Sequence, residues 1–121
     1  MPVRRILVVD DSATNRHFLT EMLTRHGYRC TTAQTGAQAI EKAKAEKPDL
    51  ILMDVVMPDM DGYQATRAIT RDEETQNIPV ILCTSKNQET DKLWGIRQGA
   101  KAYVFKPVDE KDLISKITAL G

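Results

Sequence analysis

Few features of this sequence point to an extracellular or membrane protein. It contains only two cysteines, Cys30 and Cys83, which are too few for a disulfide scaffold. No apolar run approaches the roughly 18 residues of a membrane span. The N-terminus leads into only four apolar residues, 6–9, whereas the core of a signal peptide needs about 7–15. We therefore expect a cytoplasmic protein with no membrane partner.

An excess of charge of one sign is also missing. Lys and Arg number 17, Asp and Glu number 17, and the formal net charge of the 121 residues is zero. Such a chain has no overall basic field that would attract DNA or anionic lipid. Internal repeats, low-complexity segments and linkers are absent as well. The length suits one domain, spanning residues 1–121, with its own hydrophobic core.

What the sequence does contain is a regular alternation of apolar runs and amphipathic segments. The runs cover residues 6–9, 28–33, 50–53, 80–83 and 103–105. Three of them are continuously apolar, which is typical of strands covered on both faces. Polar residues interrupt the run at 28–33, which predicts a strand at the edge of the sheet.

Five amphipathic segments follow these runs and predict helices. They cover 13–26, 37–46, a stretch that begins after Gly62, 88–98, and a stretch capped by Asp109. The expected core residues of these helices are Phe18, Leu19, Met22, Leu23, Ala39, Ile40, Ala43, Ile69, Leu93, Ile96, Ala100, Leu113, Ile114 and Ile117. The order (βα)5 predicts an α/β fold with a doubly wound, five-stranded parallel sheet. Such sheets bind ligands beyond the carboxyl ends of their strands.

Acidic residues follow two of these strands. Asp10 and Asp11 come directly after the first run, and Asp54 follows the third. At roughly 4 Å, each pair of carboxylates would repel by about 4 kcal/mol at an effective dielectric of about 20. A divalent cation relieves this repulsion, and all-oxygen ligands favour Mg2+ or Mn2+. Helix capping by Asp11 or Ser12 is an alternative, but it accounts for one acid per loop and not for a pair facing a third.

A hydroxyl and a lysine follow the remaining two strands. Thr84 follows the fourth run, and Lys106, followed by Pro107, comes after the fifth. Lys106 could form a simple salt bridge with the acids. A metal, a lysine and a hydroxyl around Asp54 would also hold three phosphoryl oxygens, and an aspartate can act as a nucleophile toward phosphorus.

These residues stand in four motifs that are similar to those of response-regulator receiver domains. The motifs are ILVVDDS, LILMDVVMPDMDG, VILCTS and YVFKP, and the resemblance runs from Ile6 to Leu120. It implies a CheY-like, flavodoxin-like fold with strand order 2-1-3-4-5. The segments DVVMPDMDGYQATR and KNQETDKLWGIRQGAKAYVFKPV further resemble single-domain regulators of type IV pilus (twitching motility) chemosensory systems.

The resemblance implies a role for each residue at the candidate site. Asp54 would be the phosphoacceptor and a metal ligand. Asp11 would bind Mg2+ directly, Asp10 through water, and Val56 through its backbone carbonyl. Lys106 would pair with a phosphoryl oxygen, and its bond to Pro107 is often cis in this family.

Further residues would carry the response. Thr84 would be the switch hydroxyl, and Tyr103 the switch aromatic, inward in the active state. Val56 and Lys86 occupy the two positions that flank the attacking water during dephosphorylation. We expect that neither side chain orients that water, so that the phosphorylated form is long-lived.

The implied function is a phosphorylation-activated signalling receiver rather than an enzyme with a small-molecule substrate. The donor would be a phosphohistidine on a sensor histidine kinase or phosphotransfer domain. The surface of the fourth helix, last strand and last helix would change, and Trp94 and Tyr103 are the candidate partner contacts on it. Trp94 lies beside the predicted core stripe, so core packing is the alternative for this residue. We expect no DNA-binding output domain, action through protein partners or as a phosphate sink, and a monomer that dimerises at most weakly when phosphorylated.

Three alternatives remain open at this stage. A phosphatase of the haloacid-dehalogenase kind has an acid two residues after its nucleophile, where this chain has Val56. A flavodoxin-like FMN carrier needs a phosphate loop where Asp10 and Asp11 would repel the phosphate. A degenerate receiver would fold without taking phosphate. The two cysteines fall on the second and fourth strands, too far apart for a disulfide, and we expect both to be buried.

Overall fold

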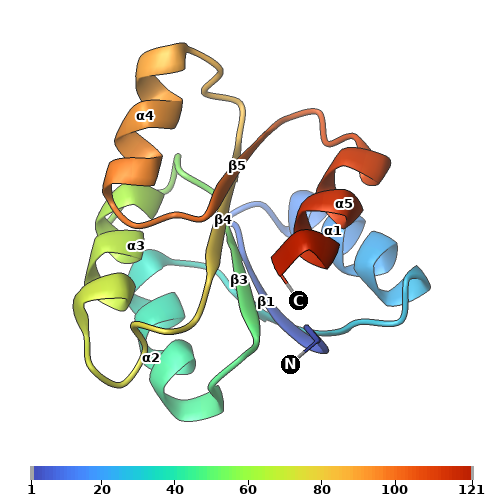
Figure 1. The fold of residues 1–121 in the computed structure, drawn as a ribbon, viewed down its shortest axis with the longest axis horizontal. Helices are drawn as coiled ribbons and strands as arrows, with labels where there is room; N and C mark the ends of the chain where they lie inside the picture. The colour runs from blue at the N-terminus through green and yellow to red at the C-terminus, as the bar shows by residue number, and fades with distance from the viewer. Residues whose placement is uncertain (1, 121) are drawn as a thin grey trace.

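The computed structural model describes residues 2–120 and contains five strands alternating with five helices. In chain order these are β1 (Arg5–Val9), α1 (Ala13–Arg25), β2 (Arg29–Ala33), α2 (Gly36–Glu46), β3 (Leu50–Met53), α3 (Gly62–Arg71), β4 (Val80–Thr84), α4 (Glu89–Arg97), β5 (Ala102–Phe105) and α5 (Glu110–Leu120). Figure 1 shows the sheet between two layers of helices. No helix within residues 2–120 is long and apolar enough to cross a membrane.

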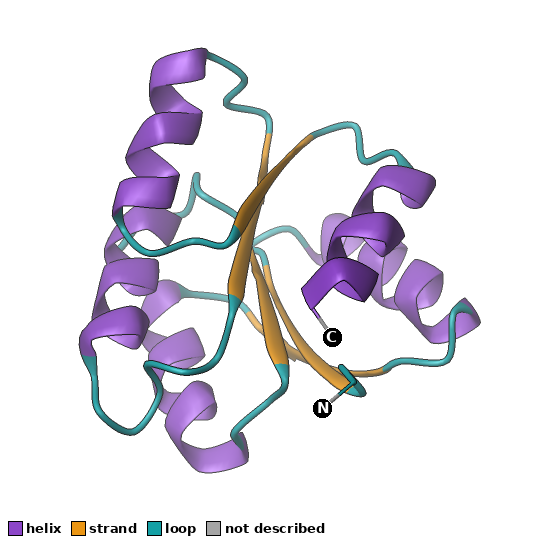
Figure 2. Ribbon diagram, viewed as in Figure 1, coloured by secondary structure: helices purple, strands orange, loops and turns teal. Residues whose placement is uncertain are grey.

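The sheet is parallel throughout, with the order β2-β1-β3-β4-β5. Helices α2, α3 and α4 cover one face, and α1 and α5 cover the other (Figure 2). Successive side chains of a strand point to opposite faces, so β1 contributes Leu7 and Val9 to one core and Ile6 and Val8 to the other. The predicted doubly wound fold and strand order are confirmed.

The edge position of β2 is visible in its burial. Its residues alternate between exposed and partly buried until Ala33, whereas β3 and β4 are buried along their whole length. Cys83 on β4 is buried as expected, but Cys30 on β2 is only half-buried because no further strand covers that edge. Both cysteines are free thiols.

The prediction of the buried face of α4 is wrong for Leu93 and Ile96, whereas Ala100, which lies beyond the end of the helix, is buried as predicted. Leu93 and Ile96 are 62% and 43% exposed, and Gly95 is the buried residue of this helix. A Cβ atom at Gly95 would lie 2.6 Å from Leu82 Cδ1 and 3.1 Å from the Tyr103 ring. The helix therefore packs through its glycine, and the neighbouring Trp94 stays 49% exposed.

Three smaller differences concern α1, α2 and α5. Phe18, expected in the core, is half-exposed on α1, whereas Leu19, Met22 and Leu23 are buried. Ile40 of α2 and Ile114 of α5 are only partly buried, each packed against the core formed by its neighbours. An apolar residue at the border of a helical stripe satisfies the periodicity whether or not a neighbour covers it, which is why the pattern included all three.

A close backbone approach joins α3 to the end of β3. Gly62 opens α3, and its N–H donates to the carbonyl of Val55 at 2.8 Å. A Cβ atom at Gly62 would lie 2.1 Å from the backbone oxygen of Asp54. Glycine is required here because only hydrogen fits in that space, and the position of Asp54 depends on it.

We predict that Gly62→Ala lowers the free energy of unfolding by about 3 kcal/mol, since the methyl group must displace backbone rather than a side chain. Gly36→Ala is the matched control, also at the first residue of a helix. Its Cβ would meet mainly the flexible side chain of Met60, at 3.0 Å, and we expect a loss of at most about 1 kcal/mol. Urea unfolding followed by the fluorescence of the single tryptophan measures both. Equal losses in the two variants would contradict the backbone-clash explanation.

Candidate functional site

Three carboxylates meet where β1 and β3 end. Val9 pairs with Met53 in adjacent strands, so the residues that follow them emerge side by side. One carboxylate oxygen from each of Asp10, Asp11 and Asp54 lies within 4.8 Å of the others. Asp10 and Asp54 are buried, whereas Asp11 is exposed to solvent.

Lys106 connects the two buried acids. It follows β5, and its Nζ donates to Asp10 Oδ2 at 2.8 Å and to Asp54 Oδ1 at 3.3 Å. With all groups ionised, three carboxylates and one ammonium give a charge of −3 + 1 = −2. The donor set consists of oxygens with this surplus of negative charge, which fits a hard divalent cation such as Mg2+.

Burial and neighbouring charges shift the pKa values of Asp54 and Lys106. Burial and the charge of Asp10 raise the pKa of Asp54, and the lysine offsets only part of that rise. Burial also opposes the charge on Lys106, but its hydrogen bond to Asp10 and the charge of Asp54 outweigh this effect and raise its pKa. The lysine is therefore held in its charged form between the two carboxylates.

A backbone N–H and an arginine side chain hold Asp10 in place. Its Oδ1 accepts a hydrogen bond from the N–H of Ser12 at 2.9 Å, and its carbonyl accepts one from Arg16 Nη1 at 2.7 Å. Ser12 also caps α1, accepting from the N–H of Asn15 at 3.3 Å. The sequence analysis did not identify Arg16, because an arginine six residues away on a helix gives no local signal that it will reach back to a carbonyl.

The remaining predicted residues lie around this cluster at different depths. Thr84 is fully buried at the end of β4, and its Oγ1 accepts a hydrogen bond from the N–H of Lys86 at 3.3 Å. Tyr103 points inward, beneath α4. Val56 and Lys86 are exposed. The Lys106–Pro107 peptide bond is cis.

Tyr63 also contributes to this region, although the sequence analysis did not select it. It is buried in the first turn of α3, and its hydroxyl lies 3.2 Å from that of Tyr103. In the sequence it stands where an ordinary core residue of an amphipathic helix is expected. Only its hydroxyl distinguishes it, and the partner of that hydroxyl is 40 positions away.

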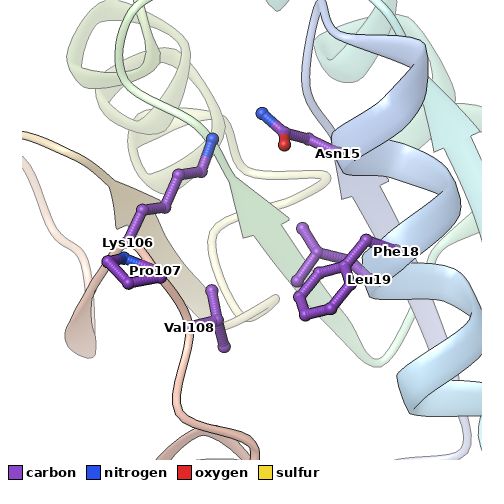
Figure 3. Close-up of a pocket in the computed structure, with 6 residues that line it drawn as sticks. All are labelled: Asn15, Phe18, Leu19, Lys106, Pro107 and Val108. Atoms are coloured by element: carbon purple, nitrogen blue, oxygen red, sulfur yellow. The ribbon is translucent and has the colours of Figure 1, made fainter.

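A hollow adjoins the site on the side of α1. It is lined by Asn15, Phe18, Leu19, Lys106, Pro107 and Val108 (Figure 3). Apart from Asn15 and the lysine, its walls are apolar, and the lysine ammonium at its edge belongs to the acidic cluster. Phe18, which is half-exposed, forms one wall of this hollow rather than part of the core.

Comparison with known proteins identifies the family. Residues 6–118 match the model of the response regulator receiver domain. The chain belongs to the response regulator receiver family. PilH of Pseudomonas aeruginosa PAO1 is 53% identical over 116 residues, which cover 96% of this receiver and 96% of PilH. The resemblance to a single-domain regulator thus extends over nearly the whole receiver.

Solved receiver structures share the fold, and one of them contains a magnesium ion. Chemotaxis protein CheY4 of Vibrio cholerae has a TM-score of 0.90 and 28% identity, and the alignment covers 98% of this chain and 99% of CheY4. The receiver domain of sensor histidine kinase PA1611 from P. aeruginosa PAO1 has a TM-score of 0.89 and 32% identity, with 98% and 97% coverage. That structure contains a magnesium ion coordinated in the active site cleft. Receiver domains bind Mg2+ at an aspartate cluster of this kind.

The raised pKa of Asp54 predicts a pH-dependent effect of neutralising this residue. Because the native state raises this pKa, the ionised carboxylate destabilises the native state at pH values above it. We predict that Asp54→Asn, in the presence of a metal chelator, increases the free energy of unfolding at pH 7. The gain should shrink as the pH falls and vanish near the unfolded aspartate pKa of about 3.9.

Urea unfolding between pH 4 and pH 8 measures this difference. Asp59→Asn is the matched control, because Asp59 is exposed in the loop after β3 and has a positive φ that asparagine tolerates. A gain for Asp54→Asn that is the same at every pH, or is matched by the control, would rule out the electrostatic cause.

Proposed function

We propose that this receiver is activated by transfer of a phosphoryl group to Asp54 from a phosphohistidine on a sensor histidine kinase or phosphotransfer domain. The observation that carries the proposal is the position of this carboxylate, buried at the carboxyl end of β3 between two other aspartates and Lys106. In the transfer, an Asp54 oxygen forms a bond to phosphorus while the phosphorus–nitrogen bond of the donor breaks. The donor imidazole keeps the electron pair of the broken bond.

The acidic cluster would hold the Mg2+ that this transfer needs. Asp11 would bind the ion directly, Asp10 through water, and Asp54 and the carbonyl of Val56 would complete the protein ligands. The ion neutralises the charge on the incoming phosphoryl oxygens. Mn2+ has the same ligand preferences and could replace it.

Lys106 and Thr84 would bind the phosphoryl oxygens after transfer. The lysine already contacts Asp54 Oδ1 at 3.3 Å, so a short movement of its flexible side chain would bring the ammonium to an oxygen of a group bound there. Thr84 would turn its hydroxyl toward a second oxygen, giving up the hydrogen bond from the N–H of Lys86. Tyr103, inward in this structure, would be held inward in the phosphorylated form.

The response would then pass to protein partners through α4, β5 and α5. Exposed apolar residues lie on this surface, among them Trp94 and Phe105. The likeness to PilH supports a role in pilus-type chemosensory signalling, either by binding a target or by acting as a phosphate sink. We propose a single receiver domain over residues 1–121 that is monomeric, or weakly dimeric when phosphorylated.

The apolar hollow beside Lys106 is a suitable contact for the phosphodonor protein. A donor histidine must bring its phosphorus within bonding distance of Asp54, so its surroundings must rest on the surface next to this lysine. Phe18, which is half-exposed, provides an apolar surface there, and the partly buried Val108 lies in the same hollow.

The proposal predicts that Mg2+ and acetyl phosphate add one phosphate to the intact protein, as measured by mass spectrometry. Asp54→Ala should give no adduct. Asp11→Ala should lose Mg2+ binding and the adduct together, whereas Lys106→Ala should retain more of its Mg2+ affinity than of its signalling response. An adduct that persists in Asp54→Ala, or equal losses of Mg2+ affinity in the two other variants, would contradict these assignments.

A second prediction concerns the lifetime of the phosphorylated form. Val56 has no polar side-chain atom to hold the attacking water, and Lys86 could cover the approach by pairing with a phosphoryl oxygen. The double change Val56→Asn and Lys86→Glu should accelerate the decay of the phosphoprotein in Mg2+ buffer, because an amide and a carboxylate can orient a water. A tenfold acceleration corresponds to about 1.4 kcal/mol in the barrier. The two single variants serve as controls. If the double variant decays at the wild-type rate, these positions do not set the lifetime.

A further inference from the structure

Arg16 lies near the N-terminal end of its helix, where a positive charge is unfavourable. It is the fourth residue of α1, which begins at Ala13. The aligned peptide groups of a helix place partial positive charge at this end, and acidic side chains are the ones that it stabilises. The helix dipole therefore does not explain the arginine. The contact that its side chain makes with the loop before the helix does.

That contact is with the peptide group between Asp10 and Asp11. Arg16 is partly buried, and its Nη1 donates to the carbonyl oxygen of Asp10 at 2.7 Å. The N–H of Asp10 donates to the carbonyl of Ala33 at 3.2 Å, so Asp10 faces β2, which ends at Ala33. A strand that continued would offer its next N–H to the Asp10 carbonyl. The guanidinium takes the place of that donor.

With this bond, every polar group of Asp10 has a partner. Its Oδ1 accepts a hydrogen bond from the N–H of Ser12 at 2.9 Å, and its Oδ2 accepts one from Lys106 Nζ at 2.8 Å. The carboxylate of Asp11, in contrast, is exposed, and its direction depends on the peptide group that Arg16 holds. If the ψ angle of Asp10 changed, that peptide group would turn and carry Asp11 with it.

Divalent cations differ in how much such a movement matters. Mg2+ requires nearly ideal octahedral geometry, at about 2.0–2.1 Å from each oxygen. Ca2+ takes about six to eight oxygens at about 2.3–2.6 Å, in a flexible geometry. A carboxylate that is turned away from its position therefore weakens the binding of Mg2+ more than the binding of Ca2+.

We propose that Arg16 is a positioning residue that makes the aspartate cluster selective for Mg2+ over the larger Ca2+, by fixing the peptide group between Asp10 and Asp11. The inference rests on the proposed function, in which Asp11 is a direct ligand of the metal. The charge of Arg16 acts in the opposite direction, because the guanidinium repels Mg2+ and Ca2+ alike. Position and charge therefore predict different results when the arginine is replaced.

The first arm of the test compares Mg2+ and Ca2+ binding to metal-free, unphosphorylated protein by isothermal titration calorimetry. Arg16→Met keeps a long side chain and removes both the hydrogen-bond donor and the charge. The ratio of the two affinities is the quantity to compare, because a change of charge alters both affinities by nearly the same factor and cancels. We expect the preference for Mg2+ over Ca2+ to fall by about threefold to tenfold, as for the loss of one hydrogen bond.

Arg25→Met is the matched control. Arg25 lies in the last turn of α1, and its Nη2 donates to Glu110 Oε1 at 3.2 Å. Its replacement removes a charge and a hydrogen bond from the same helix but leaves the contact with Asp10 intact, so the ratio should keep its wild-type value. An unchanged ratio in Arg16→Met, or an equal fall in both variants, would overturn the proposal.

The second arm needs no metal. In NMR spectra of the metal-free protein, the carbonyl carbon of Asp10 should shift in Arg16→Met, because it loses its donor, and should stay in place in Arg25→Met. An unchanged Asp10 carbonyl in Arg16→Met would also overturn the proposal, since the peptide group would then not depend on the arginine.

Failure of the proposed function gives a different result. Wild-type protein that binds no Mg2+ would contradict the metal site itself, and this role of Arg16 with it. Normal Mg2+ binding by the wild type, together with an unchanged ratio in Arg16→Met, would reject the role of Arg16 alone and leave the proposed function standing.

Discussion

The contact of Lys106 with Asp10 and Asp54 is the interaction on which the rest of the site depends. One ammonium group joins the ends of β1, β3 and β5, which are far apart in the sequence and adjacent or near-adjacent in the sheet. Without it, two buried carboxylates would repel each other in a medium where charges are poorly screened. Because the lysine neutralises only part of the acidic charge, the same contact leaves a surplus of negative charge that suits a divalent cation.

Most of the fold could be predicted from the apolar runs. A strand buried on both faces needs a short, uninterrupted apolar sequence, and this pattern is typical of the interior strands of a parallel sheet. The edge strand β2 was recognisable for the opposite reason, since polar residues interrupt its apolar run and the side chains of Arg29 and Thr31 stay exposed. The packing of α4 was not predictable in this way. The apolar periodicity predicted Leu93 and Ile96 as the buried residues. It cannot identify Gly95, which is buried because its missing side chain leaves room for Leu82 and Tyr103.

The residues of the candidate site also divide into those that could be predicted from the sequence and those that could not. Residues that directly follow a strand could be placed from the sequence, because the parallel sheet brings all such positions to one edge. Asp10, Asp54 and Lys106 are of this kind, and their contacts lie where that geometry puts them. Tyr63 and Arg16 act through the ends of long side chains. The partner of Tyr63 is 40 positions away, and that of Arg16, although only six positions away, lies before its helix begins and matches no helical spacing. The sequence contains no periodic signal for contacts of that kind.

Helix α4 is held to the domain in an unusual way. Its buried residue is a glycine, while Leu93, Trp94 and Ile96 all face solvent. The hydrophobic effect stabilises a helix in proportion to the apolar area that it removes from water, at about 25 cal/mol per Å², and a glycine contributes almost none. A shift or rotation of α4 therefore exposes little apolar surface of the helix itself. As long as Leu82 and Tyr103 beneath it stay covered, the helix can take up a new position at small cost in hydration free energy, and a partner that covers its apolar side chains can shift its equilibrium.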